Sequence, residues 1–201
     1  PRQVLTEFYT GTWCGHCPKG VFSMKRMMQQ QEGVIPAFIH HRDGFAIPEA
    51  DSLIAFMPNG YPSATFDRYN FHGGFRPAIG NYSDDSWQQA VKKRLAIPSP
   101  VALALEHSFE PSNRKLSIKL TANFVAETFG DFRVNVMLTE DNVRSSVYDQ
   151  LNYANADPNW PELNNLGNPI PDYRHDYVVR RILDGPWGIP GKLPVYPSVG
   201  E

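Results

Sequence analysis

The chain has 201 residues, of which 41% are apolar and 12% aromatic, and its formal net charge is −2. This composition is typical of an ordinary soluble globular protein, and the length allows one large domain or two small ones. Lys and Arg are dispersed rather than gathered into a basic patch, and no apolar run reaches the ~18 residues that a membrane span needs. We therefore expect no nucleic-acid partner and no transmembrane segment in this chain.

The chain begins with Pro1 rather than Met. We therefore expect that an N-terminal segment has been removed, so that the lack of a visible signal peptide says little. Two cysteines so close together cannot staple a fold, and the cysteine count alone leaves the redox compartment open.

The first hundred residues alternate between strand and helix patterns. The predicted elements, in chain order, are a strand at 3–9, a helix at 18–31, a strand at Val34–His40, a helix at Pro48–Met57, a hairpin of Ser63–Tyr69 with Gly74–Arg76, and a helix from Ser83 or Asp84 that buries Trp87, Ala90, Val91 and Leu95. This α/β arrangement closes at about residue 97.

Pro98-Ser99-Pro100 can continue neither a helix nor a central strand, so we expect a domain boundary that separates residues 1–98 from residues 99–201. Beyond it, apolar residues alternate with period two in runs that begin at Val101, Leu116 and Phe132. Three or more such strands indicate a β-sandwich or an open antiparallel sheet.

Residues 152–174 are rich in Asn, Pro and Asp, and they form a longer loop than compact domains usually hold without function or disorder. Tyr177–Leu183 is again typical of a strand. Because a complete sandwich needs further strands after it, we expect the second domain to be incomplete in this chain. The loop offers oxygen ligands for calcium, but it lacks the spacing of a known calcium loop, and turn chemistry is the better interpretation of these residues: Asn152, Asn155, Asp157 and Asn159.

Cys14 and Cys17 are the two residues that carry chemistry, and they stand between a predicted strand and a predicted helix. A Cys-x-x-Cys pair in that context indicates redox chemistry, whereas a structural zinc site would need a second cysteine pair. A thiol near a helix N-terminus has its pKa lowered from ~8.5, and it is the thiolate that attacks disulfides. His16 can add positive charge, which would stabilise the reduced form and make the pair a better oxidant.

The residues around the cysteines suggest their own roles. Gly15 is expected to let the loop turn tightly, and Trp13 to cover one side of the sulfur. Proline is best tolerated in the first helical turn, so Pro18 as the first helical residue would place Cys17, not Cys14, at the cap.

Glu7-Phe8-Tyr9 followed by Trp13-Cys14-Gly15-His16-Cys17 resembles the active-site strand and motif of the thioredoxin superfamily in its protein-disulfide-isomerase form. The predicted order of strands and helices is also that of the minimal thioredoxin-like fold. The resemblance implies that Cys14 attacks, that Cys17 resolves and that Glu7 shuttles the proton of Cys17. One departure is that Glu7 lies seven residues before Cys14, where the family usually has six.

Gly60–Phe66 is similar to the segment that carries the cis-proline of that superfamily. This likeness implies a cis bond between Tyr61 and Pro62, although only ~5% of such bonds in folded proteins are cis. It also implies that a client chain binds in strand geometry against Trp13, Tyr61 and Pro62.

Thr10–Pro18, followed by Met137–Val143 and Tyr173–Arg180, resembles the twenty-eight-kilodalton outer-membrane-protein-related family of Bacteroidetes. In that family a thioredoxin-like domain precedes a β-sandwich, and the protein is exported to the periplasm or cell surface of a Gram-negative bacterium. We therefore expect an extracytoplasmic thiol-disulfide oxidoreductase of the oxidase or isomerase type. It would need no cofactor or metal beyond the redox-active Cys14–Cys17 disulfide.

The expected partners are protein thiols or disulfides of the cell envelope, together with an association with the outer membrane or surface. The alternative is a non-catalytic surface binding protein that retains a thioredoxin-like scaffold, because a fold does not fix a function.

Overall fold

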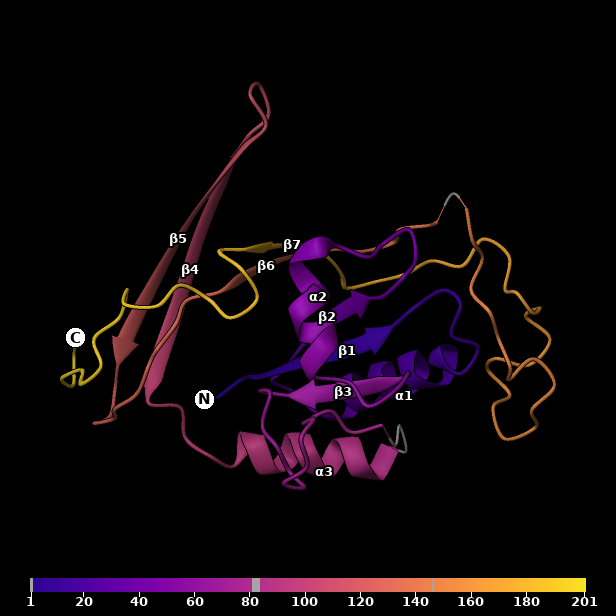
Figure 1. Ribbon diagram of the computed structural model, residues 1–201, viewed down its shortest axis with the longest axis horizontal. Helices are drawn as coiled ribbons and strands as arrows, with labels where there is room; N and C mark the ends of the chain where they lie inside the picture. Colours follow the sequence, from indigo (N-terminus) through magenta and orange to yellow (C-terminus); the bar gives the residue numbers. More distant parts are fainter. Residues whose placement is uncertain (1, 81–83, 146) are drawn as a thin grey trace. The chain divides into compact units, whose positions relative to one another are not determined.

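The computed structural model describes residues 2–80, 84–145 and 147–201, and the chain divides into two compact units (Figure 1). The larger unit holds residues 2–97 and 135–187, and the smaller unit holds residues 98–134 and 188–201. The predicted helix cap Ser83 lies outside the described residues.

The first part of the larger unit follows the predicted order of elements. These are β1 (Val4–Thr10), α1 (Cys17–Gln30), β2 (Val34–His40), the short 3-10 helix η1 (Pro48–Ala50), α2 (Asp51–Phe56), β3 (Ser63–Phe66) and α3 (Asp84–Leu95). Gly33, between α1 and β2, has a φ of +82°, which glycine adopts without steric cost.

The larger unit is built on a five-stranded mixed sheet with the order β3-β1-β2-β7-β6, where β6 is Val136–Glu140 and β7 is Val178–Leu183. β1 and β2 run parallel, and β3 is antiparallel to β1. β2 also pairs in parallel with β7, and β7 is antiparallel to β6. β2 is therefore the central strand, which explains its nearly continuous apolar sequence.

Helices cover both faces of this sheet (Figure 1). On one face, α1 and α3 pack on β1 and β2 around the buried rings of Phe8, Phe38 and Trp87. On the other face, α2 places Leu53 against a second cluster that includes Ile39 of β2. The alternation of Phe38 and Ile39 between the two clusters follows from the two-residue period of a strand.

The expected division into residues 1–98 and 99–201 is corrected by the position of β6 and β7. Ile97 and Pro98 do lie at the limit between the units, but residues 135–187 belong to the larger unit. Val178, Val179 and Ile182 of β7 are buried in it, at most 3% exposed. A period-two pattern shows that one face of a strand is buried, but it does not show against which sheet. The pattern alone therefore could not assign residues 135–187 to the larger unit.

The hairpin expected after Ser63 is also different in the structure. Gly74–Arg76 form no strand, and Ala64 instead pairs with Ile79 through two backbone hydrogen bonds of 3.1 and 2.8 Å. Asp67 and Arg68 both have a φ of 52°, so that the chain leaves the sheet directly after β3.

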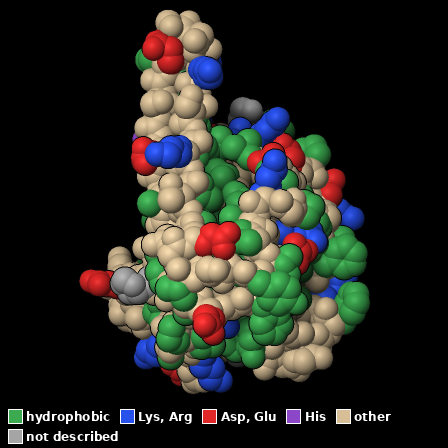
Figure 2. All heavy atoms as spheres, turned by 90° about the vertical axis from the view of Figure 1, so that its left-hand side faces the viewer, with side chains coloured by type: hydrophobic (Ala, Val, Ile, Leu, Met, Phe, Trp, Pro, Cys, Tyr) green, Lys and Arg blue, Asp and Glu red, His purple; other side chains and the backbone are tan. Residues whose placement is uncertain are grey.

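The smaller unit contains one hairpin, formed by β4 (Val101–Glu110) and β5 (Lys115–Phe124). Its register places the predicted apolar positions of both strands opposite one another, for example Leu105 with Leu120 and Phe109 with Leu116. These side chains are largely exposed; Leu105 is 57% and Phe109 58% accessible. Figure 2 shows charged side chains of both signs at the tip of the hairpin.

Within the described residues, the smaller unit contains a two-stranded antiparallel sheet in place of the expected sandwich. The third expected strand, from Phe132 to Leu138, is replaced by β6 in the larger unit. Among the helices of the described ranges, none is both long and apolar enough to cross a membrane.

Candidate functional site

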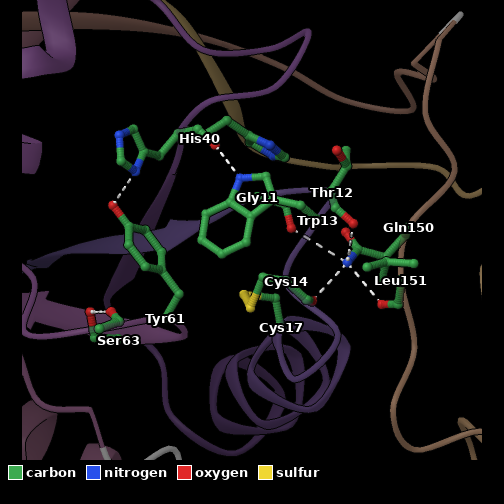
Figure 3. Close-up of a disulfide and its surroundings, with 12 residues drawn as sticks. Gly11, Thr12, Trp13, Cys14, Cys17, His40, Tyr61, Ser63, Gln150 and Leu151 are labelled. Carbon is green, nitrogen blue, oxygen red and sulfur yellow. Dashed lines mark hydrogen bonds between the residues drawn. A yellow bond between two sulfur atoms is a disulfide. The ribbon is translucent and has the colours of Figure 1, made fainter.

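Cys14 and Cys17 lie between the end of β1 and the first turn of α1, and their sulfurs form a disulfide (Figure 3). The helix begins at Cys17, with His16 as its N-cap and Pro18 in the first turn. The backbone N–H of Cys17 donates to the carbonyl of Cys14 at 3.0 Å, which closes a tight turn. The positive end of the α1 dipole therefore lies next to the pair.

The two cysteines differ in their access to solvent. Cys14 is 5% exposed, whereas Cys17 is fully buried. Both cysteines are thus largely buried, and the small exposure that remains belongs to Cys14. The roles of attacking and resolving cysteine stay a prediction.

Trp13 and Tyr61 lie beside the disulfide (Figure 3), and the ring of His41 contacts both of them. The indole N–H of Trp13 donates to the carbonyl of His41 at 2.6 Å, and the Tyr61 hydroxyl is 2.8 Å from Nδ1 of His41. Burial raises the pKa of Tyr61 to about 12, and burial followed by the charge of Arg42 lowers the pKa of His41. Tyr61 and His41 therefore form a neutral hydrogen-bonded pair at neutral pH.

The bond between Tyr61 and Pro62 is cis, as predicted. Pro62 is close to the first turns of α1, because a Cβ on Gly20 would meet the Cβ of Pro62 at 2.8 Å. A hollow of about 270 Å³ is lined by Pro62, Tyr61 and His16 together. The structure thus brings these three predicted site residues to one surface beside the disulfide.

The long connection between β6 and β7 also contributes to the site, which the sequence did not predict. Gln150, from the long connection between β6 and β7, is 2% exposed, and its side-chain amide donates to the carbonyls of Cys14 at 3.0 Å and Thr12 at 3.2 Å (Figure 3). The backbone N–H of Leu151 donates to the same Thr12 carbonyl at 2.9 Å, and that of Tyr153 donates to the carbonyl of Gly15 at 2.8 Å. The connection is therefore hydrogen-bonded along the whole cysteine loop.

The ring of Tyr153 restricts which residue fits at position 15, between the two cysteines. A Cβ on Gly15 would lie 2.5 Å from the Tyr153 ring, well inside van der Waals contact. His16, exposed to solvent, meets the same ring edge-on at 5.2 Å between centroids. Gly15 therefore makes room for a neighbour, in addition to its expected role in the turn.

Ion pairs fasten the same connection to α1. Lys19 contacts Asp157 and Lys25 contacts Asp176, each at 2.7 Å. The length of residues 152–174 predicts a functional or disordered segment, and it is the sequence signal that points towards the site. Turn contacts occur here, as expected: the backbone N–H of Ala154 donates to Oδ1 of Asn152, and that of Asn159 donates to Oδ1 of Asp157, each at 3.0 Å.

Glu7 is fully buried on β1, and its carboxylate is held by Arg68. Arg68 donates to both carboxylate oxygens, through Nε at 2.9 and 3.1 Å and through Nη2 at 2.6 Å, and Thr65 Oγ1 donates at 2.9 Å. Burial lowers the pKa of Arg68, but the hydrogen bonds and charge of Glu7 outweigh it and raise this pKa overall. Within the described ranges, no hydrogen bond joins Glu7 to Cys17, so its proton-relay role remains a prediction.

A buried histidine and a buried carboxylate contact each other, and the carboxylate also binds the backbone of the cysteine loop. Nδ1 of His40 is 2.6 Å from Asp43, which also accepts the backbone N–H of Thr12 at 2.8 Å. Burial raises the pKa of Asp43, but the bonds from His40 and the backbone lower it overall. Burial, followed by the charge of His40, lowers the pKa of nearby His175 to about 3. The described residues contain no group of three or more metal-ligating side chains.

Comparisons with known proteins show similarity at the level of the fold. No protein-family profile and no curated protein sequence matches the chain. The solved structure of HBP35 of Porphyromonas gingivalis is 19% identical with a TM-score of 0.68, over 90% of this chain and 56% of that one. A crystal structure of a protein from Agrobacterium tumefaciens is 13% identical with a TM-score of 0.53, over 90% of this chain and 71% of that one. The chain thus spans little more than half the length of HBP35.

Proposed function

We propose that the chain is a thiol-disulfide oxidoreductase with a thioredoxin-like larger unit, acting on protein thiols and disulfides outside the cytoplasm. The observation that carries the proposal is the disulfide at the start of α1, in which Cys14 is 5% exposed and Cys17 is fully buried. The cis bond before Pro62 and the hollow shared by His16, Tyr61 and Pro62 support it, because an extended client chain could lie there.

In the oxidising direction, a client thiolate attacks Sγ of Cys14. The Cys14–Cys17 bond breaks, Cys17 leaves as a thiolate, and a mixed disulfide joins the client to Cys14. A second client thiolate then attacks the client sulfur of that mixed disulfide, and Cys14 leaves. The client gains a disulfide, and the Cys14–Cys17 pair is reduced by two electrons.

The surroundings favour the reduced, anionic form of Cys14. The N-terminus of α1 supplies the positive end of the helix dipole. His16, exposed at the N-cap, can add positive charge or a hydrogen bond. Stabilising the thiolate makes the pair a stronger oxidant, so we expect a reduction potential nearer to about −180 mV than to about −270 mV. Equilibration with glutathione measures it.

Glu7 is the proposed acceptor of the proton from Cys17. Its ion pair with Arg68 keeps it in place inside the sheet. Replacement of Glu7 by Gln should slow the reactions of Cys17 in a pH-dependent way. A pH profile identical to that of the wild type would remove Glu7 from the mechanism.

A trapping experiment tests the proposal. In a Cys17→Ser variant, Cys14 can attack a client disulfide, but the mixed disulfide cannot be resolved internally. We expect covalent complexes with exported proteins that disappear on reduction and are absent in the matched Cys14→Ser variant. Equal amounts of complex from both variants, or none from either, would contradict the proposal.

We assign the chain to the periplasm or cell surface of a Gram-negative bacterium. Support comes from the sequence resemblance to an exported Bacteroidetes family and from the fold shared with HBP35 of Porphyromonas gingivalis.

The exposed apolar face of the β4–β5 hairpin favours a second candidate function, that of a surface binding protein. Under this alternative, a chain with Cys14→Ser and Cys17→Ser would bind outer-membrane vesicles as well as the wild type does. Loss of binding in that variant would exclude it.

A further inference from the structure

A second hollow, of about 460 Å³, is lined by Trp13 and by residues that do not line the Pro62 hollow. Trp13 forms one wall of this second hollow. Tyr61 lines the Pro62 hollow, and its ring meets the ring of Trp13 edge-on with 5.2 Å between the centroids. Thr12 and Arg42 also line it, and the rest of the lining comes from the connection between β6 and β7, including Val147, Tyr148, Leu151 and Pro169. The hollow therefore exists only because this connection packs beside the cysteine loop.

The hollow has a fixed position relative to the reactive sulfur. Leu151 is bound to the Thr12 carbonyl at 2.9 Å, and the adjacent Gln150 is bound to the Cys14 carbonyl at 3.0 Å. Trp13 directly precedes Cys14 in the chain. A client whose sulfur reaches Cys14 would thus have a neighbouring side chain beside this hollow.

The lining defines the chemistry of the occupant. Most of its lining is aromatic or aliphatic, and its two charged residues, Arg42 and Asp149, have opposite formal charges. Such a site attracts no net charge, and it gains free energy by removing apolar surface from water. The volume exceeds what one aromatic side chain fills.

We propose that this hollow is a specificity pocket for a large aromatic or aliphatic residue next to the client cysteine, an inference that rests on the proposed exchange activity of Cys14. Burial of one such side chain corresponds to a gain in apparent affinity on the order of tenfold. The connection between β6 and β7 is then a selectivity element as well as a support for the loop.

The test uses two peptides, each with one cysteine linked to nitrothiobenzoate, that differ only in a Phe or Ala beside the cysteine. The Cys14 thiolate attacks the peptide sulfur, the reporter disulfide breaks, and coloured nitrothiobenzoate leaves. Rates are divided by those with free glutathione to remove intrinsic differences between the peptides. We expect the Phe peptide to react about tenfold faster than the Ala peptide.

Val147→Asp places a charge in the wall at a side chain that is 68% exposed, so the fold tolerates it. This variant should bring the ratio of the two rates close to one. The matched control is Val199→Asp, at a valine that is 62% exposed in the smaller unit, and it should leave the ratio unchanged. A wild-type ratio of one, or equal effects of both variants, would overturn the pocket.

Failure of the exchange activity gives a different result, because neither peptide would then react faster with the protein than with glutathione. In that case the pocket is tested by binding of cysteine-free Phe and Ala peptides to the oxidised chain. Methyl resonances of Val147 and Leu151 should shift with the Phe peptide alone. Equal shifts, or none, would contradict the pocket independently of any redox chemistry.

Discussion

Gly15 is required in the cysteine loop by the ring that lies on it. Its φ is not in the left-handed region, but a Cβ at this position would come within 2.5 Å of the Tyr153 ring. Turn residues are often explained by backbone conformation alone, and here a contact with a residue far along the chain gives the stronger reason.

Replacement of Gly15 by Ala should lower the free energy of unfolding by about 1–3 kcal/mol, the usual cost of overpacking. Urea unfolding of the oxidised protein measures it. In a Tyr153→Ala background the same replacement should cost much less, because the clashing ring is gone. Gly60→Ala is the control, since a Cβ there meets nothing within 4 Å. Equal losses at Gly15 and Gly60, or no relief by Tyr153→Ala, would contradict this account.

His175 gives the fold a dependence on acid. Burial, followed by the charge of His40, lowers its pKa from 6.5 to about 3 in the folded state. Between these two values the unfolded chain binds the proton and the folded chain does not, so stability falls as the pH falls from about 6.5 towards 3. The loss from this group is at most about 1.4 kcal/mol per pH unit.

A His175→Gln variant should therefore lose less stability than the wild type between pH 7 and pH 5. The comparison of urea midpoints at the two pH values measures the difference. His72→Gln, at an exposed histidine, should keep the slope of the wild type. If the His175 and His72 variants share one slope, the buried neutral state of His175 is wrong.

At the scale of elements, the connection between β6 and β7 behaves as part of the site. It is long and contains no helix or strand in its described residues, yet Gln150 and Asn152 are buried and bonded within it or to the cysteine loop. Loops are usually the mobile parts of a fold, and this segment is held by specific hydrogen bonds instead.

We expect slow amide hydrogen exchange at Leu151 and Tyr153, whose N–H groups bond to Thr12 and Gly15. The amide of Val147, which donates to the Ser145 hydroxyl at an exposed site, should exchange fast. Gln150→Leu removes the side-chain donor and should speed exchange at Leu151 and Tyr153 without global unfolding. Fast exchange at both amides in the wild type would show that the connection does not hold the loop.

The sequence was sufficient to predict the elements that position the cysteines. Val34–His40 is predicted with its observed bounds, and the start of α1 differs by one residue, because the apolar periods and Pro18 are local signals. The cis bond before Pro62 followed from a family likeness. Gln150 could not be found in this way, because its partners in the cysteine loop lie 136 or more residues away and nothing local marks a glutamine as a ligand of backbone carbonyls.

At the scale of the whole molecule, the larger unit is discontinuous in sequence. Residues 98–134 leave the sheet after α3, and the chain then returns to complete the sheet with β6 and β7. A domain boundary can be read from Pro98 and its neighbours, but the return of the chain cannot, because strand pairing across such a distance leaves no local pattern.

A chain that stops at residue 98 should therefore fail to fold. It lacks Val178, Val179 and Ile182, whose burial contributes about 1.5–3 kcal/mol each, against a typical total stability of about 5–15 kcal/mol. A chain of residues 2–187 in which a flexible linker replaces residues 98–134 should fold cooperatively. Circular dichroism during urea unfolding separates the two, and cooperative unfolding of the shorter chain would contradict the corrected division.

The most direct test of the central claim is the pH dependence of alkylation at Cys14 in the reduced protein, with the Cys14→Ser variant as the blank. If the N-terminus of α1 and its surroundings hold the Cys14 sulfur as an anion, the midpoint will lie well below the ~8.5 of a free thiol. A midpoint at or above that value would contradict an activated nucleophile at this position.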